Sequence, residues 1–110
     1  EISLGMSEAD AASEGWRGSP VGDYLKSTSG WNIDGNGNDG NGSNSSGFTG
    51  LPGGYRYSGG FNGVGFPGYW WSASESGSNS WWRVLDYDDD DVHRYYYDRD
   101  NGFSARCVRD

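Results

Sequence analysis

The sequence predicts an α+β domain in which two short helices precede an antiparallel sheet. Signals that begin and end helices occur only before residue 30, whereas aromatic runs of alternating character, separated by turn residues, follow Gly68. The stretch between them is rich in Gly, Asn and Ser. This segregation of helices and strands along the chain is typical of α+β folds.

The content of Leu, Ile, Val and Phe lies near the lower limit for a chain that folds. Only 15 of the 110 residues are Leu, Ile, Val or Phe, and the formal net charge is −8, a combination typical of disordered chains. Six Trp and eight Tyr reverse this expectation, because each aromatic side chain can bury about 150–250 Å². We therefore expect residues 1–110 to form one domain with a small aromatic core, cut from a longer protein.

Charge and hydropathy exclude several function classes. A strongly acidic chain repels nucleic acid and anionic lipid. No apolar run approaches the roughly 20 residues that a membrane helix needs, so no direct membrane insertion is expected. The single cysteine, Cys107, excludes an internal disulfide.

Two helices are expected before residue 30. In the first, Ser7 and Asp10 fit a capping pattern, alanines follow, and Gly15 is a natural stop. The second begins at Ser19-Pro20, with Ser as the cap and Pro in the first helical position. It runs to Lys26 and ends in a polar stretch.

The middle of the chain reads as loops. Residues 32–47 contain one aliphatic residue and cannot drive their own burial, so they form a long loop that is either mobile or held by an ion. A turn at 52–54 precedes Tyr55-Arg56-Tyr57, and a Gly-rich loop covers 58–68.

Four strands are expected in the last part of the chain: 69–73, 81–87, 92–98 and 103–108. Turn residues at 76–80, 88–91 and 100–102 separate them into a meander. Four adjacent carboxylates at 88–91 would repel one another in a paired ladder, so this segment must turn.

Alternation along these strands sorts their side chains into two faces. Leu85 and Val92 fall on one face, which we assign to the core, together with an apolar row at Phe103, Ala105 and Cys107. The opposite face carries a mixture of aromatic and acidic groups, namely Val84, Asp86, His93, Tyr95 and Tyr97.

Several blocks of sequence together resemble one protein family. They are Trp16-Arg17-Gly18, Leu25-Lys26-Ser27-Thr28-Ser29-Gly30-Trp31, Leu51-Pro52-Gly53-Gly54-Tyr55-Arg56, Gly68-Tyr69-Trp70-Trp71-Ser72-Ala73 and Gly102-Phe103-Ser104-Ala105-Arg106-Cys107-Val108-Arg109-Asp110. In order and spacing they resemble the Fibrobacter major paralogous domain (FISUMP) family over nearly the whole chain. Ala105 stands where the family usually has Val, a harmless departure in an apolar row.

The resemblance implies a C-type-lectin-like fold, related to the formylglycine-generating enzyme, in an extracellular or surface-anchored bacterial protein. It also implies kinship with variable proteins of diversity-generating retroelements, in which adenines of Asn codons are randomised. Such codons can reach Tyr, Asp, His, Ser, Val, Gly and Arg, but not Trp, Lys, Met, Gln or Glu. Residues 84–100 contain none of these five, whereas Leu85, Val92 and Arg94 match positions that the family tends to hold fixed.

The Tyr/Asp-rich segment is the main candidate site. Tyrosines offer large contact area at low entropic cost, as in antibody paratopes. The candidate ligand-binding residues are Ser76, Val84, Asp86, Tyr87, Asp88, Asp90, His93, Tyr95 and Tyr97. Because this region is acidic, a basic or amphipathic protein, or another cell-surface ligand, is the expected partner. The alternative is a solvated acidic hairpin bearing ordinary strand tyrosines.

Calcium is the one cofactor that the sequence suggests. Asp34, Asn36 and Asn38 have the alternating oxygen groups of a calcium loop, but the Gly and Glu that complete such a loop are missing. A bound ion here would hold the loop. For Asp88 to Asp91, a solvated turn is the preferred interpretation over a calcium site.

The sequence favours a non-enzymatic binding module. His93 is the sole histidine and has no evident acid/base pairing, and one cysteine cannot supply the paired cysteines of the related oxidase. Two alternatives remain: a structural or adhesive surface domain without a specific ligand, and an enzyme of the same fold superfamily.

Overall fold

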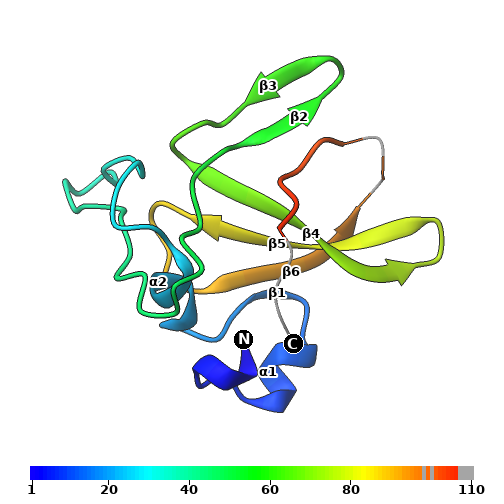
Figure 1. Cartoon of the computed structure of the whole chain (residues 1–110), viewed down its shortest axis with the longest axis horizontal. Helices are drawn as coiled ribbons and strands as arrows, with labels where there is room; N and C mark the ends of the chain where they lie inside the picture. The colour runs from blue at the N-terminus through cyan, green and yellow to red at the C-terminus, as the bar shows by residue number, and fades with distance from the viewer. Residues whose placement is uncertain (98, 100, 107–110) are drawn as a thin grey trace.

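The computed structural model describes residues 1–97, 99 and 101–106. It is mostly β, with two short helices at the N-terminal end (Figure 1). Its elements are the 3-10 helix Ile2–Leu4, α1 (Glu8–Ala12), β1 (Gly15–Arg17), α2 (Val21–Leu25), β2 (Tyr55–Tyr57), β3 (Gly60–Asn62), β4 (Pro67–Ser76), β5 (Asn79–Asp86) and β6 (Val92–Tyr97). Within the described residues, no helix is long and apolar enough to cross a membrane.

Both predicted helices are present. The Ser7 hydroxyl accepts a hydrogen bond from the Asp10 backbone N–H at 3.0 Å, which confirms the predicted cap. Helix α1 ends at Ala12 and Gly15 opens β1, so the prediction of Gly15 as the helix stop was wrong. Helix α2 begins at Val21 with Pro20 as its N-cap, one residue later than predicted.

The main sheet is antiparallel, with the strand order β1-β6-β5-β4. The three consecutive strands β4, β5 and β6 confirm the predicted meander. Strand β1 was not predicted, because three residues give no periodic signal. It forms by pairing with β6, Gly15 lying opposite Arg94 and Arg17 opposite Val92.

The register confirms the predicted division into two faces. Trp81 lies opposite Tyr96 and Arg83 opposite Arg94, whereas Trp82 lies opposite Tyr95 and Val84 opposite His93. Directly opposed residues share a face, so the two sets lie on opposite sides of the sheet. We call the side of Leu85 and Val92 the inner face, and the side of Trp82 and His93 the aromatic face.

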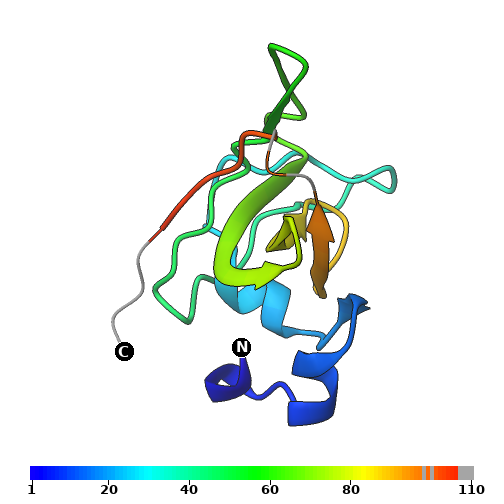
Figure 2. The same ribbon diagram turned by 90° about the vertical axis from the view of Figure 1, so that its right-hand side faces the viewer.

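The inner face carries the hydrophobic core. Leu85 and Val92 are 2% and 1% exposed and pack with Met6, Val21 and Trp31. The helices and the N-terminal segment therefore cover this face, as the alternation of Leu85 and Val92 predicts. In Figure 2 the helices lie at one end of the molecule and the β2–β3 hairpin projects from the other.

The predicted fourth strand at 103–108 is wrong for the part of it that the structure describes. Residues 102–106 form isolated bridges only, Gly102 with Arg56 and Ser104 with Trp70, and thus run beside β2 and β4. Phe103 packs on the aromatic face, with its ring centroid 4.4 Å from that of Trp71 and 4.9 Å from that of Tyr69. Its assignment to the core row is therefore wrong; Cys107 and Val108 lie outside the described residues.

The predicted loop at 58–68 contains a strand. β2 and β3 pair as a hairpin whose two connecting residues, Ser58 and Gly59, have φ of 49° and 80°. Positive φ at both central residues is the geometry of a type I′ turn, which suits the twist of two paired strands. The hairpin brings Tyr55 and Tyr57 next to the main sheet.

Candidate functional site

A continuous row of aromatic rings crosses the aromatic face. Neighbouring ring centroids lie 4.9–5.5 Å apart, and the row runs through Trp16, His93, Trp82, Tyr69 and Tyr55. Each ring comes from a different strand, in the order β1, β6, β5, β4 and β2. The row steps diagonally at Trp82, because the β5 residue that lies directly between His93 and Tyr69 is Val84.

The exposed rings of this face lie at the β1 and β6 side. Trp16, Tyr95 and Tyr97 are 41%, 38% and 49% exposed. Val84, in contrast, is 3% exposed, because its direct neighbours on the adjacent strands are Tyr69 and His93. Val84 therefore lies on the predicted face but is enclosed by its neighbours, whereas Tyr95 and Tyr97 on the same face are exposed.

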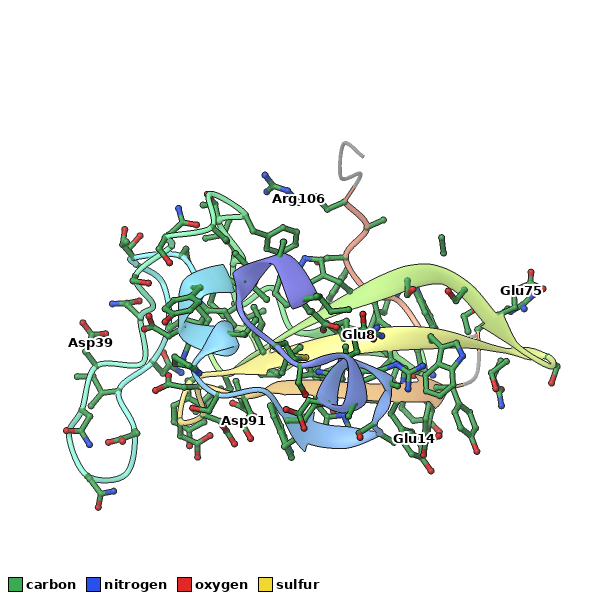
Figure 3. All side chains as sticks on the ribbon, turned by 90° about the horizontal axis from the view of Figure 1, so that it is seen from below. Glu8, Glu14, Asp39, Glu75, Asp91 and Arg106 are labelled. Atoms are coloured by element: carbon green, nitrogen blue, oxygen red, sulfur yellow. The ribbon has the colours of Figure 1, made fainter. Side chains whose placement is uncertain are left out.

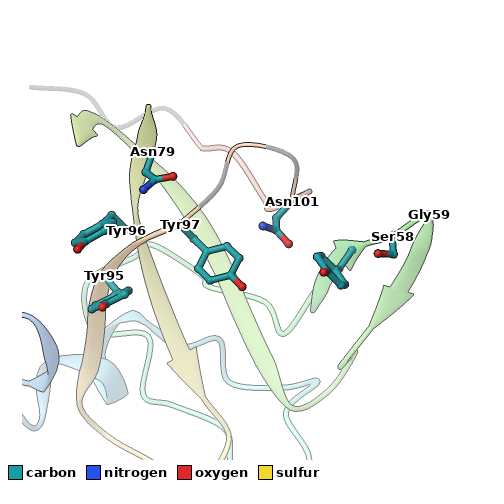
Figure 4. A pocket seen from close by; sticks show the side chains of 8 residues that line it. Ser58, Gly59, Asn79, Tyr95, Tyr96, Tyr97 and Asn101 are labelled. Atoms are coloured by element: carbon teal, nitrogen blue, oxygen red, sulfur yellow. The ribbon is translucent and has the colours of Figure 1, made fainter. Parts of the chain in front are cut away.

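A cavity of about 720 Å³ lies between the end of β6 and the tip of the β2–β3 hairpin (Figure 4). We call it the tyrosine groove; its lining residues are Tyr57, Ser58, Gly59, Asn79, Tyr95, Tyr96, Tyr97 and Asn101. None of these side chains is charged at neutral pH. The groove thus offers aromatic surface together with hydroxyl and amide groups that both donate and accept hydrogen bonds.

A second hollow, of about 360 Å³, connects the tyrosine groove to the row of rings. It shares Tyr57, Tyr97 and Asn101 with the groove and is further lined by Tyr55, Tyr69, Trp82 and Phe103. A ligand in the groove could therefore extend over the aromatic face without crossing a charged side chain of the lining.

His93 is enclosed by aromatic rings. Its ring lies 4.9 Å from Trp16 and 5.5 Å from Trp82, centroid to centroid. Burial, and secondarily the Arg17 charge, lower the pKa of His93, so the neutral imidazole is favoured. The buried atoms His93 Nδ1 and Trp82 Nε1 have no hydrogen-bond partner among the described residues.

The acidic turn, residues 88–91, lies at the other end of the sheet from the groove. Asn79 lines the groove, and Asp86 lies seven positions further along β5, a span of about 23 Å at the usual rise of a strand. Ser76 pairs with Asn79 and so lies near the groove. Asp86, Asp88 and Asp90 do not surround the same site as Tyr95 and Tyr97.

The acidic turn folds around the buried ammonium group of Lys26. This side chain is 2% exposed, and its Nζ donates to the carbonyl oxygens of Asp86 and Asp89 at 3.2 and 3.0 Å. Nζ also lies 3.4 Å from Asp90 Oδ1. Burial raises the pKa of Asp86 and of Asp91, and the neighbouring carboxylates raise both further. The turn is thus organised by an internal cation.

Tyr87 belongs to the packing of the fold. It contacts the core cluster, and its ring meets that of Phe66 edge-on at 5.2 Å. The structure therefore places Tyr87, a predicted ligand-binding residue, apart from Tyr95 and Tyr97. Alternation ends at Asp86, where β5 ends, so the position of Tyr87 could not be read from the strand pattern.

The proposed calcium loop is held by its own hydrogen bonds. Asp34 Oδ1 accepts from the backbone N–H groups of Asn36 and Asn38, both at 2.8 Å, and Asp34 Oδ2 accepts from Asn38 Nδ2 at 3.0 Å. These bonds lower the pKa of Asp34. Both carboxylate oxygens are engaged and Asn38 presents its nitrogen, so the residues do not fit a calcium site in this geometry.

Several residues of the site were missed from the sequence. From the sequence, Trp16 and Tyr57 had no expected part in the site, and Asn79 and Asn101 were expected only as turn residues. They reach the site through pairing between distant segments. Across the described residues, no group of three or more His, Cys, Asp or Glu side chains could hold a metal ion.

Fold and site together define a small, mostly β domain with a neutral aromatic groove at one end of its sheet and an acidic turn at the other. The chain belongs to the Fibrobacter succinogenes major domain family, whose model matches residues 1–109. Comparison with curated proteins and with solved structures gives no match.

Proposed function

We propose that this domain is a non-enzymatic binding module that recognises a protein or another cell-surface ligand with its aromatic face and tyrosine groove. The observation that carries the proposal is the concentration of partly exposed aromatic side chains around one concave, uncharged surface. Tyrosine and tryptophan are the residues that contribute most to binding hot spots, because they bring large, rigid surfaces with few rotamers to fix.

The proposal includes a C-type-lectin-like fold and an extracellular or bacterial cell-surface location. The order of elements supports the fold assignment: two short helices, long loops and a final antiparallel meander. Belonging to the Fibrobacter succinogenes major domain family supports it as well, through the resemblance described above.

We also propose that the gene is diversified by a retroelement. Two of the positions expected to stay fixed, Leu85 and Val92, lie in the core. The third, Arg94, places its guanidinium carbon 3.9 Å from the centre of the Trp81 ring and donates to the Ala12 carbonyl. Exposed Tyr95 and Tyr97 could change with little effect on packing. An upstream template repeat that differs from the gene only at adenines would support diversification; its absence favours an adhesive domain without a specific ligand.

The binding proposal is tested by a ligand screen with two matched variants. The first carries His93→Ala, Tyr95→Ala and Tyr97→Ala. The second carries Ile33→Ala, Leu51→Ala and Val64→Ala, which are at least as exposed but lie on loops away from the groove.

A ligand of the aromatic face loses at least about tenfold in affinity with the first variant and binds the second as it binds the natural chain. Equal binding to all three proteins would show that the face is not the site. Circular dichroism of both variants checks that the loss does not come from unfolding.

A further inference from the structure

Strand β6 has an outer edge that the described residues pair only in part. Its inner edge pairs with β5 over residues 93–97, but on the outer side β1 pairs only with Val92, His93 and Arg94. β1 begins at Gly15, where the chain turns away toward α1. The backbone N–H and C=O groups of Tyr95–Tyr97 that point away from β5 therefore have no strand partner among the described residues, and such an edge is a template for another strand.

The side chains at this edge belong to the proposed binding face. Tyr95 and Tyr97 lie on the aromatic face and Tyr96 on the inner face, and all three line the tyrosine groove. The rings of Tyr95 and Tyr96 stack at 4.8 Å although successive strand residues point to opposite sides. They therefore converge around the outer edge, where an added strand would part them.

The β1 side of the edge is acidic. Residues 2–16 contain three acids, Glu8, Asp10 and Glu14, and no Lys or Arg; all three acids are exposed. Glu14 directly precedes the β1 residue that pairs with Arg94, and Figure 3 shows it at the β1 edge of the sheet, whereas Glu8 lies over the sheet. Two basic residues flank Tyr95–Tyr97. Arg94 is engaged by the Ala12 carbonyl and the Trp81 ring, and Arg99 by Glu75 and the Asn79 carbonyl.

We propose that the outer edge of β6 at Tyr95–Tyr97 receives an extended, basic segment of a partner protein as an additional strand. This strand lies in line with β1, along the part of the same edge that β1 leaves unpaired. The inference rests on the proposed function and specifies the chemistry of its ligand. Backbone hydrogen bonds supply affinity that does not depend on side chains, and every second partner residue lies beside Tyr95 or Tyr97, which read its identity. Basic side chains there meet aromatic rings and nearby carboxylates.

The test uses the whole domain, labelled with ¹⁵N, and a synthetic octapeptide of alternating Lys and Thr. A matched octapeptide of alternating Glu and Thr is the charge control. Two further peptides carry N-methyl groups on either all Lys or all Thr residues, which removes every second backbone donor and leaves the charge unchanged.

The Lys-Thr peptide should shift the amides of Tyr95–Tyr97 and protect from hydrogen exchange those of them that point away from β5, and the Glu-Thr peptide should do neither. One N-methylated peptide should bind at least about tenfold more weakly and the other nearly as well as the parent, because alternate residues of a strand face the same neighbour. Equal binding of both methylated peptides, or shifts that spare residues 95–97, would overturn the added-strand model.

Two protein variants separate local from overall charge. Glu14→Lys, beside the edge, should weaken binding of the Lys-Thr peptide at least threefold. Asp88→Lys, at the far end of the sheet, makes the same change in net charge and should weaken this binding less. Equal effects would count against the edge. If the peptides fail but the triple alanine variant still loses a ligand found in the screen, the aromatic face remains the binding surface and only the added strand is refuted.

Discussion

Replacing Lys26 by Met tests whether the acidic turn depends on its buried ammonium group. Methionine keeps most of the apolar stem and removes the charge and its three N–H donors. The carbonyls of Asp86 and Asp89 then lose their donor in a site where the replaced side chain is 2% exposed. A buried acceptor without a hydrogen-bond donor costs more free energy than one that water can reach.

The expected loss in the free energy of unfolding is about 3 kcal/mol. Removing one partner of a buried charged cluster costs about 3–5 kcal/mol, and the lower end applies because the carboxylate of Asp90, which the ammonium contacts, is 57% exposed. A domain of this size is stable by about 5–15 kcal/mol. The variant should therefore melt about 10–20 °C below the natural chain.

Urea and thermal unfolding followed by circular dichroism measure this loss. Asp90→Asn is the matched control: it removes only the exposed partner of Lys26 and should cost at most about 1 kcal/mol. A loss below about 1 kcal/mol for Lys26→Met, or equal losses for the two variants, would refute the idea that the turn folds around this cation.

Three further predictions follow from the geometry. Gly22→Ala places a Cβ 2.5 Å from two carbonyl oxygens of the acidic turn and should cost about 1–3 kcal/mol by urea unfolding, whereas Gly35→Ala, with open space around it, should cost little. Because the folded-state pKa of His93 is lowered, the unfolded chain binds its proton more tightly; stability is full above pH about 6.5 and falls as the pH drops below it. His93→Gln should remove that part of the slope between pH 7.5 and 5, and an unchanged slope would contradict the assignment. Millimolar calcium should leave the melting temperature unchanged, since both Asp34 carboxylate oxygens already accept hydrogen bonds; a clear rise would restore the calcium site.

The elements that local sequence controls were predictable. Alternation along 81–86 and 92–97 correctly placed Leu85 and Val92 in the core and His93, Tyr95 and Tyr97 on the other side. The cap at Ser7 was equally visible, because a capping residue and its partner lie within one turn. Such features depend on neighbours in the chain and carry their own signal.

The features that depend on distant segments were not predictable in the same way. β1 pairs with a strand more than seventy residues away in the sequence. Residues 102–104 form bridges with β2 and β4 rather than with β6, the strand that precedes them in the chain. Phe103 therefore covers the aromatic face, although its alternation with Ala105 looked like a core row. Alternation says which residues share a face, but the identity of the partner strand decides which face is buried.

The same reasoning explains why the predicted site divides. Asp86, Asp88 and Asp90 are close in sequence to Tyr95 and Tyr97. In the antiparallel hairpin of β5 and β6, however, the aspartates lie at the connecting turn and the tyrosines lie toward the opposite, open end. The turn end meets α2 and Lys26, and the open end meets the β2–β3 hairpin. Charge and aromatic surface, which the sequence shows as one Tyr/Asp-rich segment, are thus separated along the sheet.

This separation bears on how such a face can vary. Near the acidic turn, side chains and backbone carbonyls fix a buried lysine, so substitutions there act on folding. Val84, midway along β5, is enclosed by Tyr69 and His93 and has little room for a larger or charged side chain. Toward Tyr95 and Tyr97 the side chains are partly solvated and the backbone edge is unpaired by any described residue. Variation confined to that end changes what the surface can bind at little cost in stability, because the contacts that hold the strand in place are made by its backbone on the β5 side and by Val92 in the core.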